Sequence, residues 1–499
     1  MGVAMSRSTS VIDLPVKRPR RQRGPERNTY SEPDIAAMLA DSEVLYELGE
    51  AFPHWQPGDP GRPPHFPPEA VLLFGFMSGG WHFKRKTERQ LKHRATWEPI
   101  RRALFRRFPH YKGLRPGGPT ITRHNYRYWR ERYGIGDDQI SLLRDGLRRA
   151  AVKQALDMGM FNPANGSVTH PDPRNMLAGD ATVIKSRFDA APGSRQIDPE
   201  TGEIVPKLTD PDASHYPVFD EFGNKTGDRV YGTKFGILQA RNPGQDHERV
   251  VVDLFHITDE SEAPSVERAV QSVQQLVPGL SGVVYDMALR GINREHFYDL
   301  GLHTITKCPM IRKGQVRTRA LGLFEARTLG RVVERVEVWG VGGAASLKVT
   351  VGAKHEFVAL KRERTFRQAK GGGRKKVGRA YRWYNAYTVP SDPRVPLRLR
   401  GASLMLRLDD PKHEDSKIRL AENLHAIAPG EDDWERLFDL RNPTESVNNW
   451  VKERLQGKKS RAPAVGARRT QFDLLCLAGY NNFVAALAFA DRVKRPVAA

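Results

Sequence analysis

The sequence contains little cysteine and no long hydrophobic segment. Only two of its 499 residues are cysteines, Cys308 and Cys476, and neither stands in a Cys-x-x-Cys or Cys/His spacing. This scarcity argues against a disulfide framework and against a structural zinc site. The longest apolar runs, such as residues 70–77, are too short to span a bilayer, and no charged-then-apolar signal segment opens the chain. We therefore expect a reduced, cytoplasmic protein with no membrane partner.

Negative charge is also scarce. The chain carries 58 Asp and Glu against 80 Lys and Arg, which gives a formal net charge of +22. A field of this sign favours a polyanionic partner, and nucleic acid is the usual one. A soluble basic enzyme is the alternative, but the basic clusters recur along the whole chain. Histidines and glycine-rich segments say less, because they show neither a metal-ligand spacing nor a strand-to-helix phosphate loop.

The N-terminal part of the chain is predicted to be helical. A chain of this length is expected to form roughly three domains. Residues 1–30 are polar and basic, which predicts a disordered arm that either touches phosphates nonspecifically or has no role. In residues 31–166, apolar residues recur at helical spacing after Ser or Pro start signals, notably over 33–40 and 68–77.

One stretch of this helical domain, residues 120–133, interleaves cations with aromatic residues. A helix of this composition can lay its arginines along DNA phosphates while its aromatic side chains hold the core. Arg123, Arg127 and Arg130 are therefore the candidate DNA contacts, and residues 31–166 the candidate DNA-binding domain. No clear helix-turn-helix spacing is present, so no base-specific recognition is predicted.

From about residue 167 the pattern changes to strands that alternate with helices. Three strand-like runs come first, at 176–184, 231–240 and 248–257. A helix at 265–276, a strand at 283–286, a helix at 293–300 and a strand at 303–307 follow. This order indicates a mixed sheet of the α/β class over residues 167–310. A loop rich in Gly, Pro and Asp, residues 189–229, separates the first two strands.

Residues 311–430 interrupt this scheme. Runs with period-two alternation predict a β-rich insertion that covers one side of the sheet, at 332–339, 346–351 and 382–389. A basic glycine-rich loop, residues 370–379, lies between the last two runs. Helices return in residues 431–456, which complete the core, and again in residues 457–499, which comprise a basic linker and a C-terminal helix.

Two aspartates stand within or at the end of apolar strand-like runs. Asp180 follows Met-Leu-Ala-Gly and precedes Ala-Thr-Val-Ile, where a carboxylate is unfavourable in itself. Its alternative role is to cap a turn beside a bulge marked by Gly179. Asp286 ends Gly-Val-Val-Tyr, and the carboxyl ends of strands in α/β sheets are where ligands collect. Its alternative role is the N-cap of the following helix.

A third acid lies in the most informative segment of the chain. Phe438, Arg441, Glu445 and Lys452 stand at offsets 0, 3, 7 and 14, which fall on one side of a single helix. A carboxylate with cations before and after it on such a face suits a substrate that is anionic and metal-bound. The competing interpretation begins the helix at Pro443, with Glu445 in a capping box and Arg441 outside the helix.

Three carboxylates in this setting predict metal-dependent phosphodiester chemistry. Two Mg²⁺ ions about 3.5–4 Å apart can activate an oxygen nucleophile and stabilise the leaving oxygen. Mg²⁺ prefers carboxylates, substrate phosphates and water, and Mn²⁺ shares this preference. Asp180, Asp286 and Glu445 are therefore sufficient candidate ligands, and no catalytic Ser, Cys or His is required.

With its acids in the order Asp, Asp, Glu on a mixed sheet followed by a helix, the chain resembles the DDE transposases of bacterial insertion sequences. It is similar to the subgroup in which Tyr, Arg, Glu and Lys are separated by two, three and six residues. Phe438, Arg441, Glu445 and Lys452 keep that spacing, with Phe in place of Tyr. The resemblance implies an RNase H-like core split by a β-rich insertion between Asp286 and Glu445. It also implies that the three acids hold two metal ions and that Arg441 and Lys452 contact DNA phosphates.

The resemblance further implies an enzyme that cuts double-stranded DNA at terminal inverted repeats and joins the freed 3′ hydroxyl to target DNA. Two ends must be held together, so a homodimer on DNA at the bacterial nucleoid is expected. Two alternatives stay open. One is a DNA-binding protein descended from a transposase and no longer catalytic, and the other is a metal-dependent nuclease without strand transfer.

Overall fold

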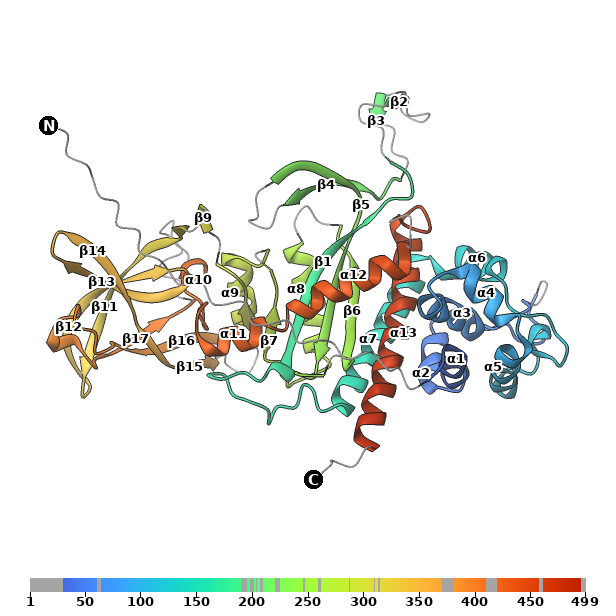
Figure 1. Ribbon diagram of the computed structural model, residues 1–499, viewed down its shortest axis with the longest axis horizontal. Helices are drawn as coiled ribbons and strands as arrows, with labels where there is room; N and C mark the ends of the chain where they lie inside the picture. Colours follow the sequence, from blue (N-terminus) through green and yellow to red (C-terminus); the bar gives the residue numbers. More distant parts are fainter. Residues whose placement is uncertain are drawn as a thin grey trace.

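The computed structural model describes the chain from Tyr30 to Lys494, with gaps (Figure 1). The residues outside the description are 1–29, 61–63, 190–194, 198–201, 203, 207–209, 220–224, 246, 259–261, 287, 309, 313–314, 370–380, 410–419, 457–460 and 495–499. Some side chains within described elements, including those of residues 442–447, also lie outside it. The predicted basic arm, the glycine-rich loop 370–379 and most of the linker after residue 456 fall in these gaps.

The described chain begins with helices that pack together at one end of the molecule (Figure 1). They are α1 (Glu32–Ala40), α2 (Glu43–Gly49), α3 (Pro68–Gly80), α4 (Lys84–Leu91), α5 (Arg94–Arg107), α6 (Arg123–Trp129) and α7 (Asp137–Asp157). The predicted helices over 33–40 and 68–77 are α1 and α3. The Ser31 side chain accepts the Asp34 N–H in a capping box, which explains the start of α1. The helix predicted over 120–133 is shorter, because α6 gives way to a π-helical turn at Arg130–Gly134.

The centre of the molecule is a mixed sheet with the strand order β6-β5-β1-β7-β8 and β4 beside β5. The bounds are β1 (Met176–Lys185), β4 (Ser214–Phe219), β5 (Lys225–Arg241), β6 (Arg249–His256), β7 (Gly282–Val284) and β8 (His303–Ile305). β5 runs antiparallel to β1 and β6, whereas β1, β7 and β8 are parallel. Two crossover helices serve the parallel strands, α8 (Ala263–Gln274) and α9 (Gly291–Asp299). The predicted mixed α/β fold with a helical N-terminal region is confirmed.

The predicted loop of residues 189–229 contains structure that the sequence did not indicate. Besides β4, it forms a separate two-stranded hairpin of β2 (Arg195–Ile197) and β3 (Ile204–Pro206). The hairpin projects from the central sheet in Figure 1. Gly, Pro and Asp in the segment break the period-two signal, so short strands between turns escape a pattern-based prediction.

Alternate residues of β1 serve the two faces of the central sheet. Met176 and Ala178 face a cluster with residues of the helices that follow residue 426, whereas Leu177 faces a cluster built with α7 and α8. The sheet is therefore the middle of three layers. The two helices near the first face are α11 (Asp432–Phe438) and α12 (Asn442–Gln456), and α12 lies across β1 in Figure 1.

A second sheet occupies the end of the molecule opposite the N-terminal helices (Figure 1). It has seven antiparallel strands in the order β14-β13-β12-β11-β17-β16-β15. Their bounds are β11 (Thr318–Thr328), β12 (Arg331–Val341), β13 (Ala344–Val351), β14 (Lys354–Ala359), β15 (Lys361–Ala369), β16 (Tyr381–Thr388) and β17 (Ser403–Arg407). A short hairpin, β9 (Met310–Arg312) with β10 (Gln315–Val316), precedes them. The three period-two runs of the sequence are β12, β13 and β16.

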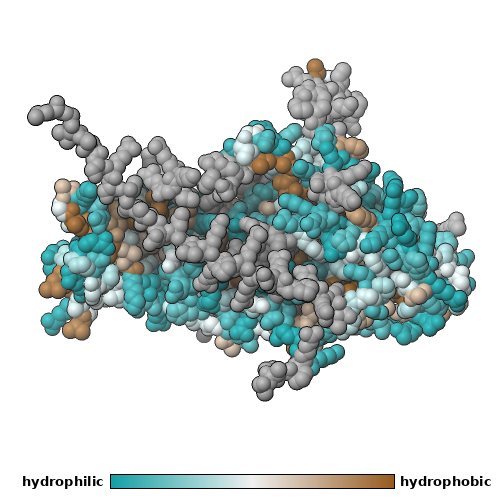
Figure 2. Space-filling model, in the orientation of Figure 1, coloured by the Kyte–Doolittle hydropathy of each residue, from teal (hydrophilic) through white to brown (hydrophobic). Residues whose placement is uncertain are grey.

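The second sheet contacts the helices that lead to α12. The Trp383 indole on β16 donates to the Tyr298 carbonyl of α9 at 2.7 Å, and the Trp383 side chain is fully buried. The Arg362 guanidinium on β15 donates to Asp433 of α11 at 3.0 Å. Most of the visible surface is hydrophilic, but brown residues appear at the outer end of this sheet in Figure 2. One exposed apolar residue of the sheet is Leu329, which is 98% exposed at the β11–β12 turn.

The long helix α13 (Ala467–Lys494) joins the helical region to the central sheet. It packs on α3, and its Asn482 amide donates to the Val251 carbonyl at 2.8 Å while the Asn482 side-chain oxygen accepts the Val251 N–H at 2.7 Å. These bonds satisfy the outer edge of β6, which would otherwise present unpaired backbone groups. By length and composition α13 is apolar enough to cross a membrane, but 61% of its most apolar window is buried inside the protein. It is packed here as a core helix.

Candidate active site

Asp180 lies on β1, and Asp286 lies two residues beyond the end of the neighbouring parallel strand β7, at the same level. Ala178 of β1 pairs with Val284 of β7, and each aspartate lies two residues beyond its member of that pair. Because side chains alternate along strands and parallel strands lie about 4.8 Å apart, the two carboxylates share one face. β7 ends at Val284, whereas β1 continues to Lys185, so β1 has no β7 partner beside Asp180. This opening at the carboxyl end of a strand is the position that the sequence predicted for a site.

Gly179 allows this arrangement by making room for Tyr285. A Cβ atom added at Gly179 would lie 2.7 Å from the Tyr285 ring and 2.6 Å from Leu238. The pairing of β1 with β5 shows no shift at Gly179, so the bulge considered from the sequence is absent from this strand pair. Tyr285 is fully buried, and it fixes the backbone immediately before Asp286. The glycine therefore serves close packing behind the carboxylates.

The Asp180 carboxylate is half-buried but hydrogen-bonded. Its Oδ1 accepts the Ala181 N–H at 3.0 Å, and its Oδ2 accepts the Asn448 side-chain amide at 2.8 Å. Burial raises the pKa of Asp180 to about 6; the Arg441 guanidinium opposes this rise and the Asp286 carboxylate adds to it. Asp286 is itself fixed by the Ala288 N–H, which donates to its Oδ1 at 2.7 Å. This bond lies in the loop three residues before α9 begins. The N-cap of α9 is Arg290, so the alternative role of Asp286 as the N-cap of that helix is wrong.

A further acid, Glu262, approaches this pair and was missed in the sequence. It immediately precedes α8, it is 9% exposed, and it forms an ion pair with Lys234 of β5. Burial raises the pKa of Glu262, Asp286 adds to the rise, and Lys234 opposes it. Its charge also acts on Asp180. The one sequence signal was an acid directly before a helix start at Ala263-Pro264, and that pattern is typical of an ordinary cap.

The segment with Phe438, Arg441, Glu445 and Lys452 is not a single helix. α11 ends at Phe438, a turn follows, and α12 begins at Asn442 with Pro443 in its first turn. The expectation of one continuous helical face is therefore wrong, and Arg441 lies outside the helix, as in the competing interpretation. Proline at the second helical position lacks the N–H that a continuous helix would require there.

Phe438 is nevertheless held in a defined position. Its ring stacks on Trp434 at 4.4 Å between centroids, and Lys307 Nζ lies 5.6 Å from its centroid. Arg441 lies 6.0 Å from the same ring, and its charge reaches Asp180. The turn between the helices thus places a cation beside the two aspartates.

Helix α12 is fixed over β1 by Asn448. Its amide reaches Asp180, and Val451 one turn later is buried in the core. Glu445 lies three residues before Asn448 in this helix, a spacing that places both residues on one helical face. The side chain of Glu445 lies outside the described residues, so only its place on the helix is assigned.

Among the side chains that the structure describes, no three His, Cys, Asp or Glu residues are close enough to hold a metal ion. The donors that are present are nonetheless of the type that a hard cation prefers, because the Asp180 and Asp286 carboxylates are close enough to interact electrostatically. Burial raises the pKa of Asp180 and the Asp286 carboxylate adds to the rise, and a bound divalent cation would favour the charged form of Asp180.

Comparison with known proteins adds little to this geometry. No protein-family model matches the chain, and no curated protein sequence matches it. One similar solved structure is described as the cryo-EM structure of piggyBac transposase synaptic complex with hairpin DNA. It is 10% identical in sequence, the match covers 94% of this chain and 83% of that chain, and the TM-score is 0.23. A TM-score of this size is too low to establish a common fold.

The predicted DNA contacts on α6 and the π-helical turn after it divide into two kinds. Arg127 is exposed, and the Arg123 side chain is 42% exposed at 3.6 Å from Glu88. Arg130 is only 5% exposed, and it pairs with Asp473 of α13 at 3.1 Å. The assignment of Arg130 as a DNA contact is therefore corrected to a structural role, because its guanidinium points into the protein. Lys452 is half-buried on α12.

Proposed function

We propose that this protein is a DNA transposase that cuts transposon ends and joins the 3′ hydroxyls to target DNA by metal-dependent phosphoryl transfer. The observation that carries the proposal is the pair of Asp180 on β1 and Asp286 just beyond the end of the parallel strand β7, with α12 fixed over Asp180 by Asn448. A chain with a net charge of +22 provides the field that a DNA substrate needs.

The central sheet supports an RNase H-like core for this enzyme. Its first strand, β1, is central, with an antiparallel meander on one side and two parallel strands on the other. This is the arrangement expected of an RNase H-like sheet. The seven-stranded sheet enters the chain after Asp286 and before Glu445, at the place where the resemblance to DDE transposases implies an insertion.

Asp180, Asp286 and Glu445 would hold the metal ions. When bound, two Mg²⁺ or Mn²⁺ ions supply an activated oxygen nucleophile and stabilise the leaving oxygen. The contribution of the protein is to keep the carboxylates in place and charged. The Asn448 amide donates to Asp180, and the Arg441 charge opposes the rise that burial causes in the pKa of Asp180.

Cations beside these carboxylates would receive the DNA backbone. Arg441 lies in the turn before α12, and Lys452 lies three turns into that helix. The negative charge of a DNA phosphate must be neutralised when it lies next to three acids. Arg441 and Lys452 stand on either side of Glu445 in the sequence. Two protomers would bring two transposon ends into one complex.

The experiment uses duplex DNA that carries the inverted repeats flanking the coding region. With Mg²⁺ or Mn²⁺, the protein should nick this duplex at the repeat boundary and join pre-cleaved 3′ hydroxyl ends to a plasmid. Asp180→Ala, Asp286→Ala and Glu445→Ala should each abolish cleavage and preserve end binding. Asp172→Ala is the matched control, since it removes an aspartate that lies outside the site and pairs with Arg174.

Each outcome has a distinct meaning. Retained cleavage in one of the three variants would remove that residue from the site. Cleavage without joining of pre-cleaved ends would identify a nuclease. End binding by the wild-type protein without metal-dependent nicking would identify a DNA-binding protein that has lost its chemistry.

A further inference from the structure

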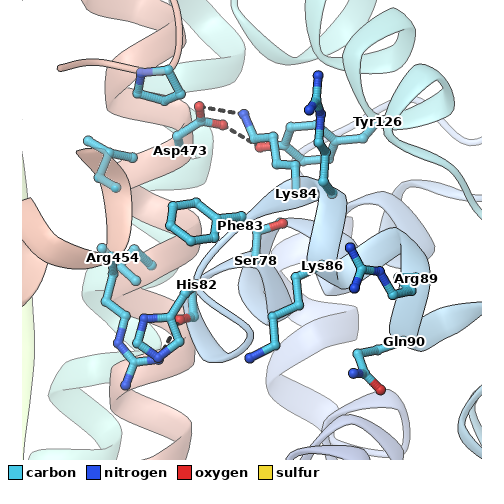
Figure 3. A pocket seen from close by; sticks show the side chains of 16 residues that line it. Ser78, His82, Phe83, Lys84, Lys86, Arg89, Gln90, Tyr126, Arg454 and Asp473 are labelled. Carbon is cyan, nitrogen blue, oxygen red and sulfur yellow. Dashed lines mark hydrogen bonds and ion pairs between the residues drawn. The ribbon is translucent and has the colours of Figure 1, made fainter. Parts of the chain in front are cut away.

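A cavity of about 530 Å³ lies away from the carboxylates, where the turn between α3 and α4 meets α12 and α13. Its walls come from Tyr126 and from two segments. The first supplies Gly75, Ser78, Gly79, residues 82–86, Arg89 and Gln90, and the second supplies Arg454, Leu455, Pro463, Asp473 and Leu477. In Figure 3, Phe83 lies in the middle of the lining, between Asp473 on one side and His82 with Arg454 on the other. The volume is in the range that small ligands occupy in proteins.

The lining carries unbalanced positive charge. The acidic residue of the lining, Asp473, is already neutralised, since Lys84 lies 2.7 Å and Arg130 3.1 Å from its Oδ2. Within the part of the chain that the structure describes, no carboxylate pairs with Arg85, Lys86 or Arg89, which are exposed around the same cavity. The cavity is therefore electropositive after its internal ion pairs are counted.

The start of α4 adds to this field. No side chain caps this helix, and its first turn contains Lys84, Arg85 and Lys86 with no acid. Cations at a helix N-terminus are unfavourable by themselves, because the helix dipole favours an anion there. A phosphate at this position would satisfy both the free N–H groups and the side-chain charges.

Two further details mark the turn before α4. Phe83 is 46% exposed, although a large aromatic ring gains by burial. His82 has a backbone φ of 69°, a left-handed conformation that is strained for a non-glycine residue and is retained more often where it has a use. Partial burial, then Arg454 and Lys86, lower the pKa of His82, in keeping with a positive field in the cavity.

We propose that this cavity binds an unpaired nucleotide of DNA, with the base stacked on Phe83 and the phosphates held by Arg85, Lys86 and Arg89. Cationic grooves with exposed aromatic rings are the sites at which proteins bind unstacked bases, and such stacking tolerates any base. The inference rests on the proposed function for its choice of DNA as the ligand.

The cavity is connected to the candidate active site through α12. The Arg454 guanidinium on this helix donates to the carbonyls of Gly79 and Gly80 at 3.0 and 2.7 Å, at the C-terminus of α3. Asn448, two turns earlier on α12, contacts Asp180. A strand that leaves the duplex near the carboxylates can therefore follow α12 to the cavity.

The test measures binding of the full-length protein to labelled oligothymidylate and to a mixed-sequence duplex of the same length, in EDTA. Phe83→Ala should weaken binding to the single strand about tenfold and change duplex binding much less. Phe83→Trp should restore binding to the single strand. Lys86→Ala should make the slope of log affinity against log salt concentration for the single strand shallower, by the amount that about one phosphate contact contributes. Thymidine monophosphate in excess should compete if a free nucleotide suffices, and should not compete if the connected backbone is required.

Two variants serve as matched controls. Tyr128→Ala removes an aromatic side chain in the same helical region that is 60% exposed but lies outside the cavity lining. Lys354→Ala removes one exposed cation from β14, at the opposite end of the molecule. Equal binding of the single strand by Phe83→Ala and wild type would overturn the proposal, as would equal losses in Phe83→Ala and Tyr128→Ala. Wild-type protein that binds neither DNA would overturn the proposed function as well.

Discussion

Replacing Asp180 by Asn should stabilise the fold while removing the proposed metal ligand. The pKa of Asp180 rises from 3.8 to about 6 because the carboxylate is half-buried near Asp286. A shift of one unit corresponds to about 1.4 kcal/mol, so the shift of roughly two units sets an upper bound of about 3 kcal/mol. After an allowance for solvent screening, we expect a gain of about 1–2 kcal/mol at about pH 8.

The sign of this effect depends on pH. A carboxyl group whose pKa is raised on folding stabilises the protein below its unfolded pKa, and this contribution is lost as the pH rises through the folded value. For Asp180 the loss falls between pH 3.8 and about 6. Asn cannot ionise, so Asp180→Asn should gain stability over the wild type above about pH 6 and match it at about pH 4.

The assay is thermal unfolding in EDTA, followed by circular dichroism at both pH values. Asp172→Asn is the control of opposite sign, because the Arg174 guanidinium lowers the pKa of Asp172, and this aspartate should therefore stabilise the fold above its unfolded pKa. An Asp180→Asn variant that melts no higher than the wild type at about pH 8, or that gains equally at both pH values, would refute the reasoning. The same protein should fail to cleave DNA.

Three other substitutions follow from the same contacts. Asn448→Ala removes the hydrogen bond that the Asn448 side-chain amide donates to Asp180 at 2.8 Å. DNA cleavage should therefore fall about 10–100-fold, and the acid limb of the pH profile of cleavage should move to higher pH. Gly179→Ala places a Cβ 2.7 Å from the Tyr285 ring, so thermal unfolding should show a loss of about 1–3 kcal/mol and cleavage should fall with it. Asp473→Asn leaves two cations facing a neutral amide in the core, and denaturation should report a loss of about 3–5 kcal/mol.

The parts of the fold that sequence predicted are those with strong local periodicity. β1, β6 and the second half of β5 are apolar runs, and the short β7 and β8 each follow a clear helix. Asp180 and Asp286 stood out because a carboxylate in such a run conflicts with burial. The pairing of Ala178 with Val284, which brings the two acids to one level, is a long-range contact that no local pattern specifies.

The parts that sequence could not predict depend on which side of an element meets a neighbour. Arg130 and Arg127 stand on the same aromatic-rich segment, yet one pairs with Asp473 more than three hundred residues away and the other faces solvent. Glu262 comes near Asp286 through the packing of α8 against the central sheet, which no local pattern specifies. Pro443 did signal the break between α11 and α12, but the regular spacing of Phe438, Arg441 and Glu445 outweighed it.

The position of α13 has a consequence for how the protein is made. The core of the N-terminal helical region includes Phe472, Leu474 and Leu475, which are synthesised more than three hundred residues after α7. α3 is buried on nearly every side, and part of that cover is α13. During synthesis on the ribosome, the helical region therefore keeps apolar surface exposed until almost the whole chain has emerged. The proposed binding of DNA by this region would then require the finished protein.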